Sequence, residues 1–334
     1  MSFKDNLLAQ ARAVKSRVPG QTLGVLAFPE GEDERVITAA YQLCQEQVAE
    51  PLLIAAPDAF ESMRKRLDLP EPNFAVLNPE GLVESTANLL YSRRKHKGVT
   101  QEQALVQGAD RLFQAAALVA SGHADGAVGG AVRTTSDTVR AAIQMIGPRS
   151  GIKTISSFFL MVFEDRCLLY ADCGVIPQPS DEQLVDIAAA SAQSWTQLTH
   201  QPARIAFLSF STYGSASDPS IDVIRSGMLL TRERFPELRV DGEMQADAAL
   251  IPEIGQRKAP GSNVAGQANV LIFPNLHAGN IAYKLTERLA GATALGPILQ
   301  GLAWPMNDLS RGCNAEDIVL VSAITLMQAN QVPE

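Results

Sequence analysis

Short apolar runs alternate with longer segments of helical periodicity along the first part of the chain. Three of these runs predict buried strands: Leu23–Phe28, Glu50–Ala56 and Ala124–Gly130. Between them, Glu34–Gln47 and Gln101–Ser121 repeat apolar residues at helical spacing and predict helices. Strands that alternate with helices in this way are typical of a parallel α/β sheet.

A second series of elements follows the loop Gly147–Gly151, where glycine and proline end the preceding helix. The series consists of a possible hairpin, a helix with Ser180 as its N-cap, and two strands: Ser157–Phe163 with Cys167–Asp172, Ser180–Leu198, Arg204–Phe210 and Ala268–Phe273. We therefore expect a domain boundary near residue 150. The helix expected after Asn314 is assigned back to the first domain, so domain I comprises residues 1–148 and 300–334, and domain II residues 149–299.

Length and composition agree with two domains of a soluble enzyme. A chain of 334 residues exceeds the size at which one core usually stops growing. The net charge of −8 provides no basic surface for nucleic acid or an anionic membrane. There is no signal-peptide pattern and no apolar run near the ~20 residues of a membrane span. These observations predict a cytoplasmic protein with neither a nucleic-acid nor a membrane partner.

The cysteines predict no metal site. Cys44, Cys167, Cys173 and Cys313 are scattered, and none forms a zinc-binding spacing with another cysteine or with a histidine. Reduced thiols in a cytosolic protein are the expected interpretation.

The first candidate for chemistry is Gly129–Arg140, where a strand end passes through small residues into a hydroxyl-rich helix start. Helix N-termini bind anions because their first amides are unpaired. Thr134 and Thr135 add hydroxyl donors, and Arg133 and Arg140 add charge. The alternative, an ordinary N-cap beside exposed arginines, is equally compatible with the residues alone.

The second candidate is Pro305–Asp317, which leads into an apolar helix. Asn314 and Asp317 have the spacing of a capping box, which needs no catalytic role. Ser310 and Arg311 just before a helix start could also form an anion site, with Asp317 beside it as a base. The residues alone do not separate these two interpretations.

A third candidate is the basic run Arg93–Lys97, which is either a solvated face or a contact for the phosphates of a nucleotide-containing molecule. Several motifs are absent from the sequence: the dinucleotide-binding GxGxxG after a strand, the phosphate-binding GxxxxGK[ST] and the hydrolase GxSxG. Dinucleotide, nucleoside-triphosphate and serine-hydrolase chemistry therefore lose support.

Taken together and in order, these segments resemble the phosphate acetyltransferase family over essentially the whole chain. The segments that carry the resemblance are Phe28–Glu30, Arg94–Gly98, Ala124–Gly126, Thr134–Arg140, Ala171–Cys173, Leu208–Thr212, Gly214–Ala216, Asp241–Asp247, Asn269–Asn275, Ala278–Lys284, Gly296–Pro297 and Asp308–Cys313. The length is similar to that of the short form of these enzymes. One departure is Asn314, where serine is common in the family; both residues are good helix caps.

The resemblance implies an α/β fold of two domains, similar to the isocitrate and isopropylmalate dehydrogenases, with the active site in an interdomain cleft and a homodimeric assembly. It implies transfer of acetyl between coenzyme A and inorganic phosphate. Coenzyme A, acetyl-CoA, acetyl phosphate and phosphate are then substrates, and no tightly bound cofactor or metal is expected. A location inside a bacterial microcompartment is a further possibility that the family offers.

The resemblance also implies residue roles. Asp317 is the expected general base for the coenzyme A thiol, Arg311 binds the phosphoryl group, and Ser310 forms a hydrogen bond in the transition state. Arg94 and Arg140 assist substrate binding, and Cys173 lies near the site without acting as a nucleophile.

Three alternatives stay open at this stage. The acyl group could be longer, as in a phosphate butyryltransferase. The chain could be a two-domain protein that closes around an anion without catalysis. It could also be a dehydrogenase on the related fold, which would require nicotinamide and usually a divalent metal.

Overall fold

The computed structural model describes residues 3–330. The chain divides into two compact units, one formed by residues up to 150 together with those from 302 onward, and one formed by Gly151–Gly301. Each unit has its own sheet, and each is described by itself.

Unit 1 contains a parallel sheet with the strand order β11-β4-β1-β2-β3. Its strands are β1 (Val25–Phe28), β2 (Glu50–Ile54), β3 (Ala75–Leu77), β4 (Gly126–Gly129) and β11 (Met306–Asp308). The three strands expected in this part of the sequence are confirmed as β1, β2 and β4. β1 and β4 are buried along their whole length because helices cover both faces of the sheet.

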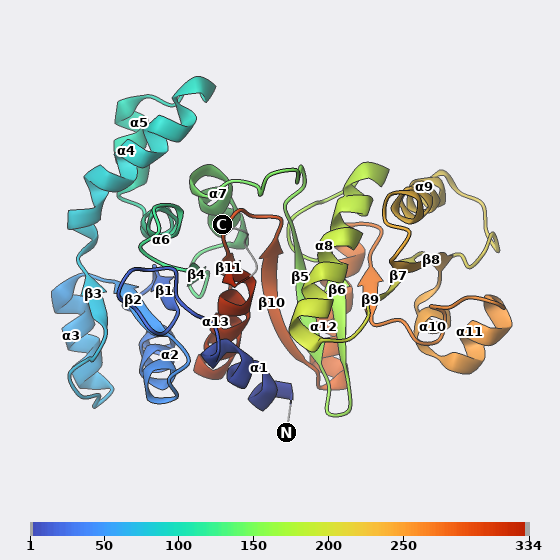
Figure 1. The fold of residues 1–334 in the computed structure, drawn as a ribbon, viewed down its shortest axis with the longest axis horizontal. Coiled ribbons are helices and arrows are strands. Elements are labelled where there is room, and N and C mark those ends of the chain that lie inside the picture. Colours follow the sequence, from blue (N-terminus) through green and yellow to red (C-terminus); the bar gives the residue numbers. More distant parts are fainter. Residues whose placement is uncertain (1–2, 331–334) are drawn as a thin grey trace. The chain divides into compact units, whose positions relative to one another are not determined.

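Figure 1 shows α2 and α13 on one face of the unit 1 sheet and α6 and α7 on the other. The α-helices of this unit are α1 (Phe3–Arg12), α2 (Glu34–Gln45), α3 (Pro57–Arg66), α4 (Val83–Arg94), α5 (Gln101–Gly108), α6 (Arg111–Ala120), α7 (Thr135–Met145) and α13 (Ala315–Ala329). Two short 3₁₀ helices, Pro79–Leu82 and Lys95–Lys97, flank α4.

One prediction for unit 1 is wrong. The sequence predicts a single helix over Gln101–Ser121, whereas the structure breaks it into α5 and α6. The reason is Asp110, whose carboxylate accepts a hydrogen bond from the Leu112 amide at 2.9 Å and so caps a new helix. Apolar periodicity alone does not register such a cap.

Unit 2 contains a mixed sheet with the strand order β10-β5-β6-β9-β7-β8. Its strands are β5 (Ser156–Val162), β6 (Cys167–Ala171), β7 (Arg204–Leu208), β8 (Arg239–Met244), β9 (Val270–Ile272) and β10 (Thr293–Gln300). β5 and β6 pair antiparallel, which confirms the expected hairpin. β6, β9, β7 and β8 run parallel to one another.

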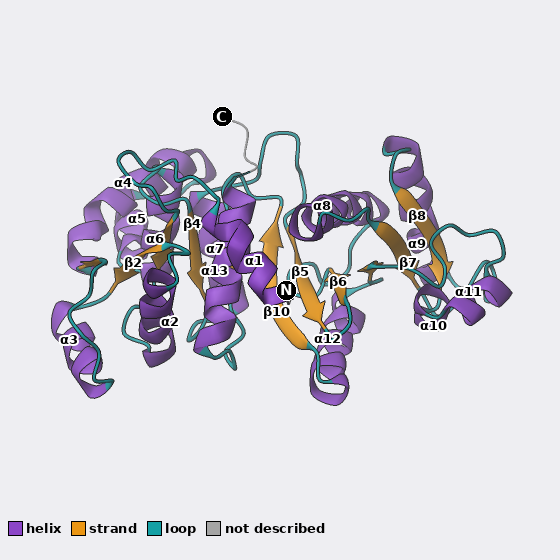
Figure 2. Cartoon of the chain, turned by 60° about the horizontal axis from the view of Figure 1, so that its bottom comes forward, coloured by secondary structure: helices purple, strands orange, loops and turns teal. Residues whose placement is uncertain are grey.

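Helices cover both faces of the unit 2 sheet, with α8 and α12 on opposite sides of the strands (Figure 2). The helices are α8 (Asp181–Thr199), α9 (Pro219–Arg234), α10 (Ala246–Leu250), α11 (Pro252–Lys258) and α12 (Leu276–Ala290). Ser180 caps α8 by accepting a hydrogen bond from the Gln183 amide, as expected. Within the described residues, no helix is long and apolar enough to cross a membrane.

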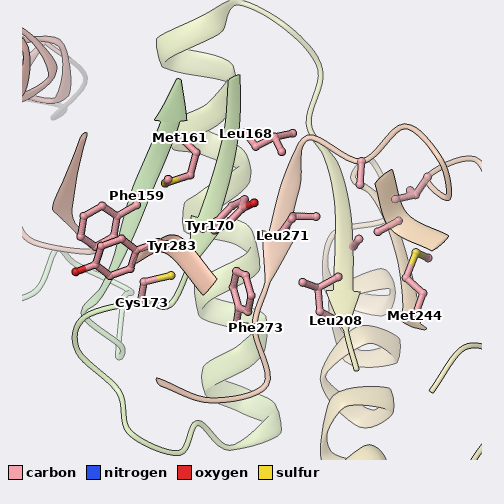
Figure 3. Close-up of a cluster of buried hydrophobic side chains, with 14 of the residues drawn as sticks. Phe159, Met161, Leu168, Tyr170, Cys173, Leu208, Met244, Leu271, Phe273 and Tyr283 are labelled. Atoms are coloured by element: carbon pink, nitrogen blue, oxygen red, sulfur yellow. The ribbon is translucent and has the colours of Figure 1, made fainter. Parts of the chain in front are cut away.

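A cluster of buried side chains joins the unit 2 strands to α12 (Figure 3). The rings of Phe159 and Tyr283 stack with centroids 3.8 Å apart. Leu208 and Phe273, at the ends of β7 and β9, belong to the same cluster. The ends of these two strands are therefore anchored in the core.

Each sheet has a point at which the connections leaving two adjacent parallel strands turn in opposite directions. In unit 1, β1 connects through α2 to β2, whereas β4 connects to α7, which packs against β11. In unit 2, β7 connects through α9 to β8, whereas β9 connects through α12 to β10. Ligands of open α/β sheets commonly bind outside the carboxyl ends of strands at such points.

Candidate active site

Three loops meet at the carboxyl edge of the unit 1 sheet because the parallel strands β1, β4 and β11 are adjacent. The loops are residues 29–33, 130–134 and 309–314. The last two contain or adjoin most of the side chains that the sequence singles out.

The loop after β4 is held in place by a carboxylate from the loop after β1. Glu30 is only 9% exposed, and its two oxygens accept hydrogen bonds from the amides of Ala131, Val132 and Arg133 at 2.7, 2.9 and 2.9 Å. All three amides therefore point toward the Glu30 carboxylate, which accepts their hydrogen bonds. The start of α7 is thereby fixed relative to β1.

Thr134 and Thr135, which we expected to bind substrate, already form internal hydrogen bonds. Thr134 caps α7, and its hydroxyl donates to Asp137 Oδ2 at 2.9 Å. The Thr135 hydroxyl donates to Asp308 Oδ2 at 2.6 Å, and the hydroxyl of Thr138 donates to Asp308 Oδ1 at 2.7 Å. Asp308 thus connects the first turn of α7 to the end of β11.

Asp308 is completely buried, so its environment differs from that of an ordinary surface carboxyl. Burial raises the pKa of Asp308 to about 7, although the hydrogen bonds from Thr135 and Thr138 oppose this shift. Gly130 has φ +98°, and any side chain there would collide with the Asp308 carboxyl. The close approach of the two loops therefore requires glycine at this position.

Arginines at the start of α7 are paired with acids. Arg140 Nη2 lies 2.6 Å from Asp137 Oδ1, and Arg133 Nη2 lies 2.7 Å from Asp110 Oδ2. The hydrogen bonds from Thr134 and Arg140 lower the pKa of Asp137. Both guanidinium groups are about half exposed, so they can exchange these partners for an anion.

The loop after β11 leads into the capping box predicted for α13. The Asp317 amide donates to Asn314 Oδ1 at 2.9 Å, and the Asn314 amide donates to Asp317 Oδ2 at 3.0 Å. Ser310 Oγ accepts a hydrogen bond from the Gly312 amide at 3.3 Å. The exposed guanidinium of Arg311 has no hydrogen-bond or ion-pair partner among residues 3–330.

The sequence did not identify Arg35, which connects all three loops. Its guanidinium pairs with Asp33 and donates to the carbonyl oxygens of Ala131 at 2.8 Å and of Arg311 and Cys313 at 2.9 and 3.2 Å. The hydrogen bond with Asp33 raises the pKa of Arg35 despite partial burial. The signal in the sequence was an acid–arginine pair at a helix start, which resembles many exposed ion pairs.

A cavity of about 500 Å³ opens between the loops after β1 and β4. Its lining is rich in acids, among them Glu30, Glu32, Asp33 and Asp110, while Arg111 and Arg133 are paired with Glu32 and Asp110. Arg311, which has no such partner among residues 3–330, and the half-exposed Arg140 lie outside this lining.

The chain matches the family profile described as "Phosphate acetyl/butaryl transferase" over residues 2–326. It is also 46% identical to the phosphate acetyltransferase of Paracoccus denitrificans, over 91% of this chain and 94% of the relative. The chain belongs to this phosphate acetyl/butaryl transferase family. The predicted resemblance is confirmed.

Other phosphate acetyltransferases give the same result. The enzyme of Acetivibrio thermocellus is 43% identical over 99% of both chains. A solved phosphotransacetylase from Streptococcus pyogenes superposes with a TM-score of 0.88 at 37% identity, covering 98% of each chain. The chain is an acyltransferase, and its reaction is reversible transfer of acetyl between coenzyme A and inorganic phosphate.

The fold prediction is confirmed as well. A 4-hydroxythreonine-4-phosphate dehydrogenase from Klebsiella pneumoniae superposes with a TM-score of 0.55 at 10% identity, covering 92% of this chain and 99% of that chain. At such low identity the likeness concerns the fold alone, which is the dehydrogenase-like α/β fold that we expected.

Arg94 was also predicted to belong to the site of this phosphate acetyltransferase. Unlike the other predicted site residues, it is not connected to the three loops in the described part of the chain. It ends α4, which packs against α6 and α7, and no hydrogen bond within residues 3–330 joins it to the three loops. Its Nε is buried without a partner. A buried donor of this kind costs free energy until a ligand or a water molecule satisfies it.

The buried thiols of the enzyme are poor nucleophiles. Burial raises the pKa of Cys173 well above its usual value and that of Cys313 to about 11, so both are protonated at neutral pH. Among the described residues, no group of three His, Cys, Asp or Glu side chains is placed to hold a metal ion.

Proposed function

We propose that Asp317 removes the proton from the thiol of coenzyme A, and that the resulting thiolate attacks acetyl phosphate directly. The observation that carries this proposal is the network around Arg35. By holding the loops at Ala131 and Arg311, it places the start of α7 and the Ser310–Arg311 turn at one edge of the sheet. One substrate can therefore contact both.

The capping box orients Asp317 for this role. Its Oδ2 accepts the Asn314 amide, and its Oδ1 accepts no hydrogen bond from residues 3–330. One oxygen therefore fixes the carboxylate while the other can accept a proton. A free thiol with a pKa near ~8.5 is mostly protonated at neutral pH, so a positioned base increases the fraction of thiolate.

Arg311 and Arg140 are the groups that we expect to bind phosphate. The guanidinium fork can contact two phosphate oxygens at once, which a lysine cannot do. Arg311 is available as it stands, whereas Arg140 must release Asp137 or share it. Ser310 is expected to donate a hydrogen bond to the oxygen that becomes negative in the transition state.

The step balances without a covalent enzyme intermediate. The sulfur–carbon bond forms as the bond between the acetyl carbon and the phosphate oxygen breaks. The thiol proton moves to Asp317, and the electron pair leaves with phosphate. In the reverse direction, phosphate attacks acetyl-CoA and Asp317 returns the proton to the leaving thiolate.

The first test is formation of acetyl-CoA from acetyl phosphate and coenzyme A by the purified protein. Turnover that requires both substrates supports the proposal, and a folded sample that shows no turnover would refute it.

Mass spectrometry of the enzyme quenched during turnover provides the mechanistic test. An acyl group on Ser310 would exclude direct attack. Comparing acetyl with butyryl phosphate measures the preferred acyl length.

We further propose that the enzyme is a homodimer. The helix α12 exposes Ile281, Leu285 and Leu289, at 57%, 53% and 81%. These residues are four positions apart, so they form one apolar stripe on the helix. Apolar stripes of this kind are commonly covered by another chain, and a second copy is the partner that the family resemblance implies.

For the location of the enzyme, we propose the cytoplasm or the interior of a bacterial microcompartment. One structural neighbour, 37% identical with a TM-score of 0.85 and covering 98% of this chain, is an EutD phosphotransacetylase from Staphylococcus aureus. Imaging of a fluorescent fusion distinguishes a diffuse signal from discrete foci.

A further inference from the structure

Glu30 is a buried carboxylate at the carboxyl edge of the unit 1 sheet, and it has no part in the proposed reaction. It follows the end of β1 directly after Pro29. Within residues 3–330, no lysine, arginine or histidine forms an ion pair with it. Because a carboxylate without a counter-charge is costly to remove from water, other groups must compensate for its burial.

Backbone amides provide this compensation. Oε2 of Glu30 accepts the amide of Ala131 at 2.7 Å, and Oε1 accepts those of Val132 and Arg133, both at 2.9 Å. Successive amides that point to one place form a concavity that binds anions in many proteins. The side chain of Glu30 therefore fills, as a built-in anion, a concavity that would otherwise suit a small anionic ligand.

The backbone on both sides of Glu30 is anchored. Pro29 restricts its own φ, and a side chain at Gly129 would collide with the Pro29 ring, so β1 and β4 approach closely at their ends (Figure 1). The amide of Gly31 donates to the carbonyl of Ile54 at 3.2 Å, which connects the loop after β1 to β2. Glu30 can therefore serve as a fixed point for the loop after β4.

The loop that Glu30 holds leads directly into groups assigned to substrate binding. Ala131 donates its amide to Glu30, and its carbonyl accepts the guanidinium of Arg35 at 2.8 Å. The chain then reaches Thr134, the N-cap of α7, and Arg140 lies on the same helix. A displacement of the loop would therefore displace the start of α7.

We propose that Glu30 is a positioning residue for acetyl transfer, which acts by filling the amide concavity of residues 131–133 and so fixing the start of α7. The inference rests on the proposed function, since it assumes that Arg140 binds the phosphate of the substrate. Glu30 acts through the loop and does not need to contact the substrate.

The substitution Glu30→Ala would leave three amides around an empty space. Glu30 lines the cavity of about 500 Å³ between the loops after β1 and β4, so this space would be open to small solutes. Formate has the same two oxygens as the lost carboxylate and can accept the same hydrogen bonds. Chloride at equal ionic strength offers a single acceptor atom and serves as the salt control.

Initial rates of acetyl-CoA formation from acetyl phosphate and coenzyme A test the proposal. Glu30→Ala should lower kcat by about 10- to 100-fold, because small displacements of reacting groups are costly. Sodium formate should restore kcat in a saturable manner, and sodium chloride should not. Glu30→Gln keeps one oxygen that can accept two of the three amides, so it should lose less activity and should not respond to formate.

The matched control is Asp125→Ala. Asp125 is also buried and accepts the amides of Arg17 and Val25 at 2.8 and 2.7 Å. It precedes β4, so it lies at the opposite, amino edge of the same sheet. Its loss should lower stability in urea unfolding without lowering kcat, which separates positioning from general destabilisation.

Three results would overturn the inference: wild-type kcat in both Glu30 variants, equal losses of kcat in Glu30→Ala and Asp125→Ala, or a folded Glu30→Ala that formate does not reactivate. If Glu30→Ala does not fold, Glu30→Gln decides. A folded Glu30→Gln with reduced kcat would support the positioning role, and one with wild-type kcat would contradict it.

Failure of the proposed function gives a different result. Absence of acetyl transfer by the wild type would contradict that function and not the filling of the concavity. Urea unfolding of Glu30→Ala with and without formate then tests the concavity alone. A higher midpoint in formate, absent from the wild type, would support the role of Glu30 as a built-in anion, and an unchanged midpoint would contradict it.

Discussion

At the carboxyl edge of unit 1, a side chain with a structural role is also the one to which we assign a chemical role in our proposal. Asp317 caps α13 with one oxygen and leaves the other open. A capping carboxylate is fixed in direction by the helix itself, which a general base also requires. The two roles are therefore compatible, and only matched substitutions can separate them.

The first prediction separates these roles of Asp317. Asp317→Asn keeps an oxygen that can accept the Asn314 amide but cannot remove a proton, and it should lower kcat by about 100-fold or more. Asn314→Ala removes the cap and retains the carboxylate. It should cost about 1 kcal/mol of stability and have a much smaller effect on kcat. Steady-state rates and urea unfolding measure both effects, and equal losses of activity would limit Asp317 to capping.

The second prediction concerns Arg35, which we describe as a positioning residue. Lysine keeps the charge but cannot contact Asp33 and three carbonyl oxygens at the same time. Arg35→Lys should lower kcat by about 10- to 100-fold, because small displacements of reacting groups are costly. The control is Arg66→Lys, which alters an exposed ion pair of α3 with Glu34 of α2. Identical rates for both variants would contradict the positioning role.

At the scale of elements, the sequence predicted the strands with continuous apolar runs and the helices with clear caps. β1, β2 and β4 follow from their apolar runs, and α8 follows from Ser180. β11 has only three residues, Met306–Asp308, and two of them are polar, so its periodicity was uninformative. Its place in the sheet depends on pairing with β4, a contact between distant parts of the chain.

The candidate site shows the same division between local and distant contacts. The capping box of Asn314 and Asp317 is local, and its spacing predicted it. The bonds of Asp308 to Thr135 and Thr138 join residues more than 160 positions apart, and no local pattern identifies them. Arg35 was missed for this reason too.

The third prediction concerns the contact of β11 with α7 and its dependence on pH. Because the pKa of Asp308 is raised to about 7, the folded state binds its proton more tightly than the unfolded chain does. The contribution of Asp308 to stability is therefore complete at low pH and decreases as the pH rises from about 4 to about 7. Asp308→Asn should abolish this decrease, since an amide does not titrate.

Urea unfolding at pH 5, 6, 7 and 8 provides the measurement. The stability of wild type relative to Asp308→Asn should fall across this series. Asp165→Asn, an exposed change in the turn between β5 and β6, should follow wild type at every pH. A constant difference between wild type and Asp308→Asn would show that Asp308 has the same pKa in both states.

At the scale of the whole molecule, the order of segments along the chain differs from the way in which they group into units. Unit 2 is one continuous segment, whereas unit 1 combines the beginning and the end of the chain. Unit 2 has a six-stranded sheet with helices on both faces and its own buried cluster. It has what an independently folding domain requires.

The fourth prediction follows from this division. The fragment 151–301 should unfold cooperatively on its own, as measured by circular dichroism during urea titration. The fragment 1–150 should not, because it lacks β11 and α13, and α13 buries the ten residues from Ile318 to Met327. Cooperative unfolding of fragment 1–150 would show that β11 and α13 are dispensable for folding of unit 1.

The fifth prediction concerns assembly. Leu285→Lys places a charge in the apolar stripe of α12 and should convert a dimer into a monomer in sedimentation velocity experiments, because burying an unpaired charge is costly. Leu105→Lys is the control, since Leu105 is similarly exposed but lies on α5 of unit 1. A dimer that survives the change in α12 would exclude this stripe as the interface.

The hydrogen bonds of Arg35 to the carbonyls of Arg311 and Cys313 can form only late in biosynthesis. The ribosome produces Arg35 early, but its partners after β11 only near the end of translation. Unit 2 can complete its sheet while unit 1 still exposes the edge of β4, and open edges invite pairing with other chains. A truncated product that ended before Met306 would therefore combine catalytic inactivity with a tendency to aggregate.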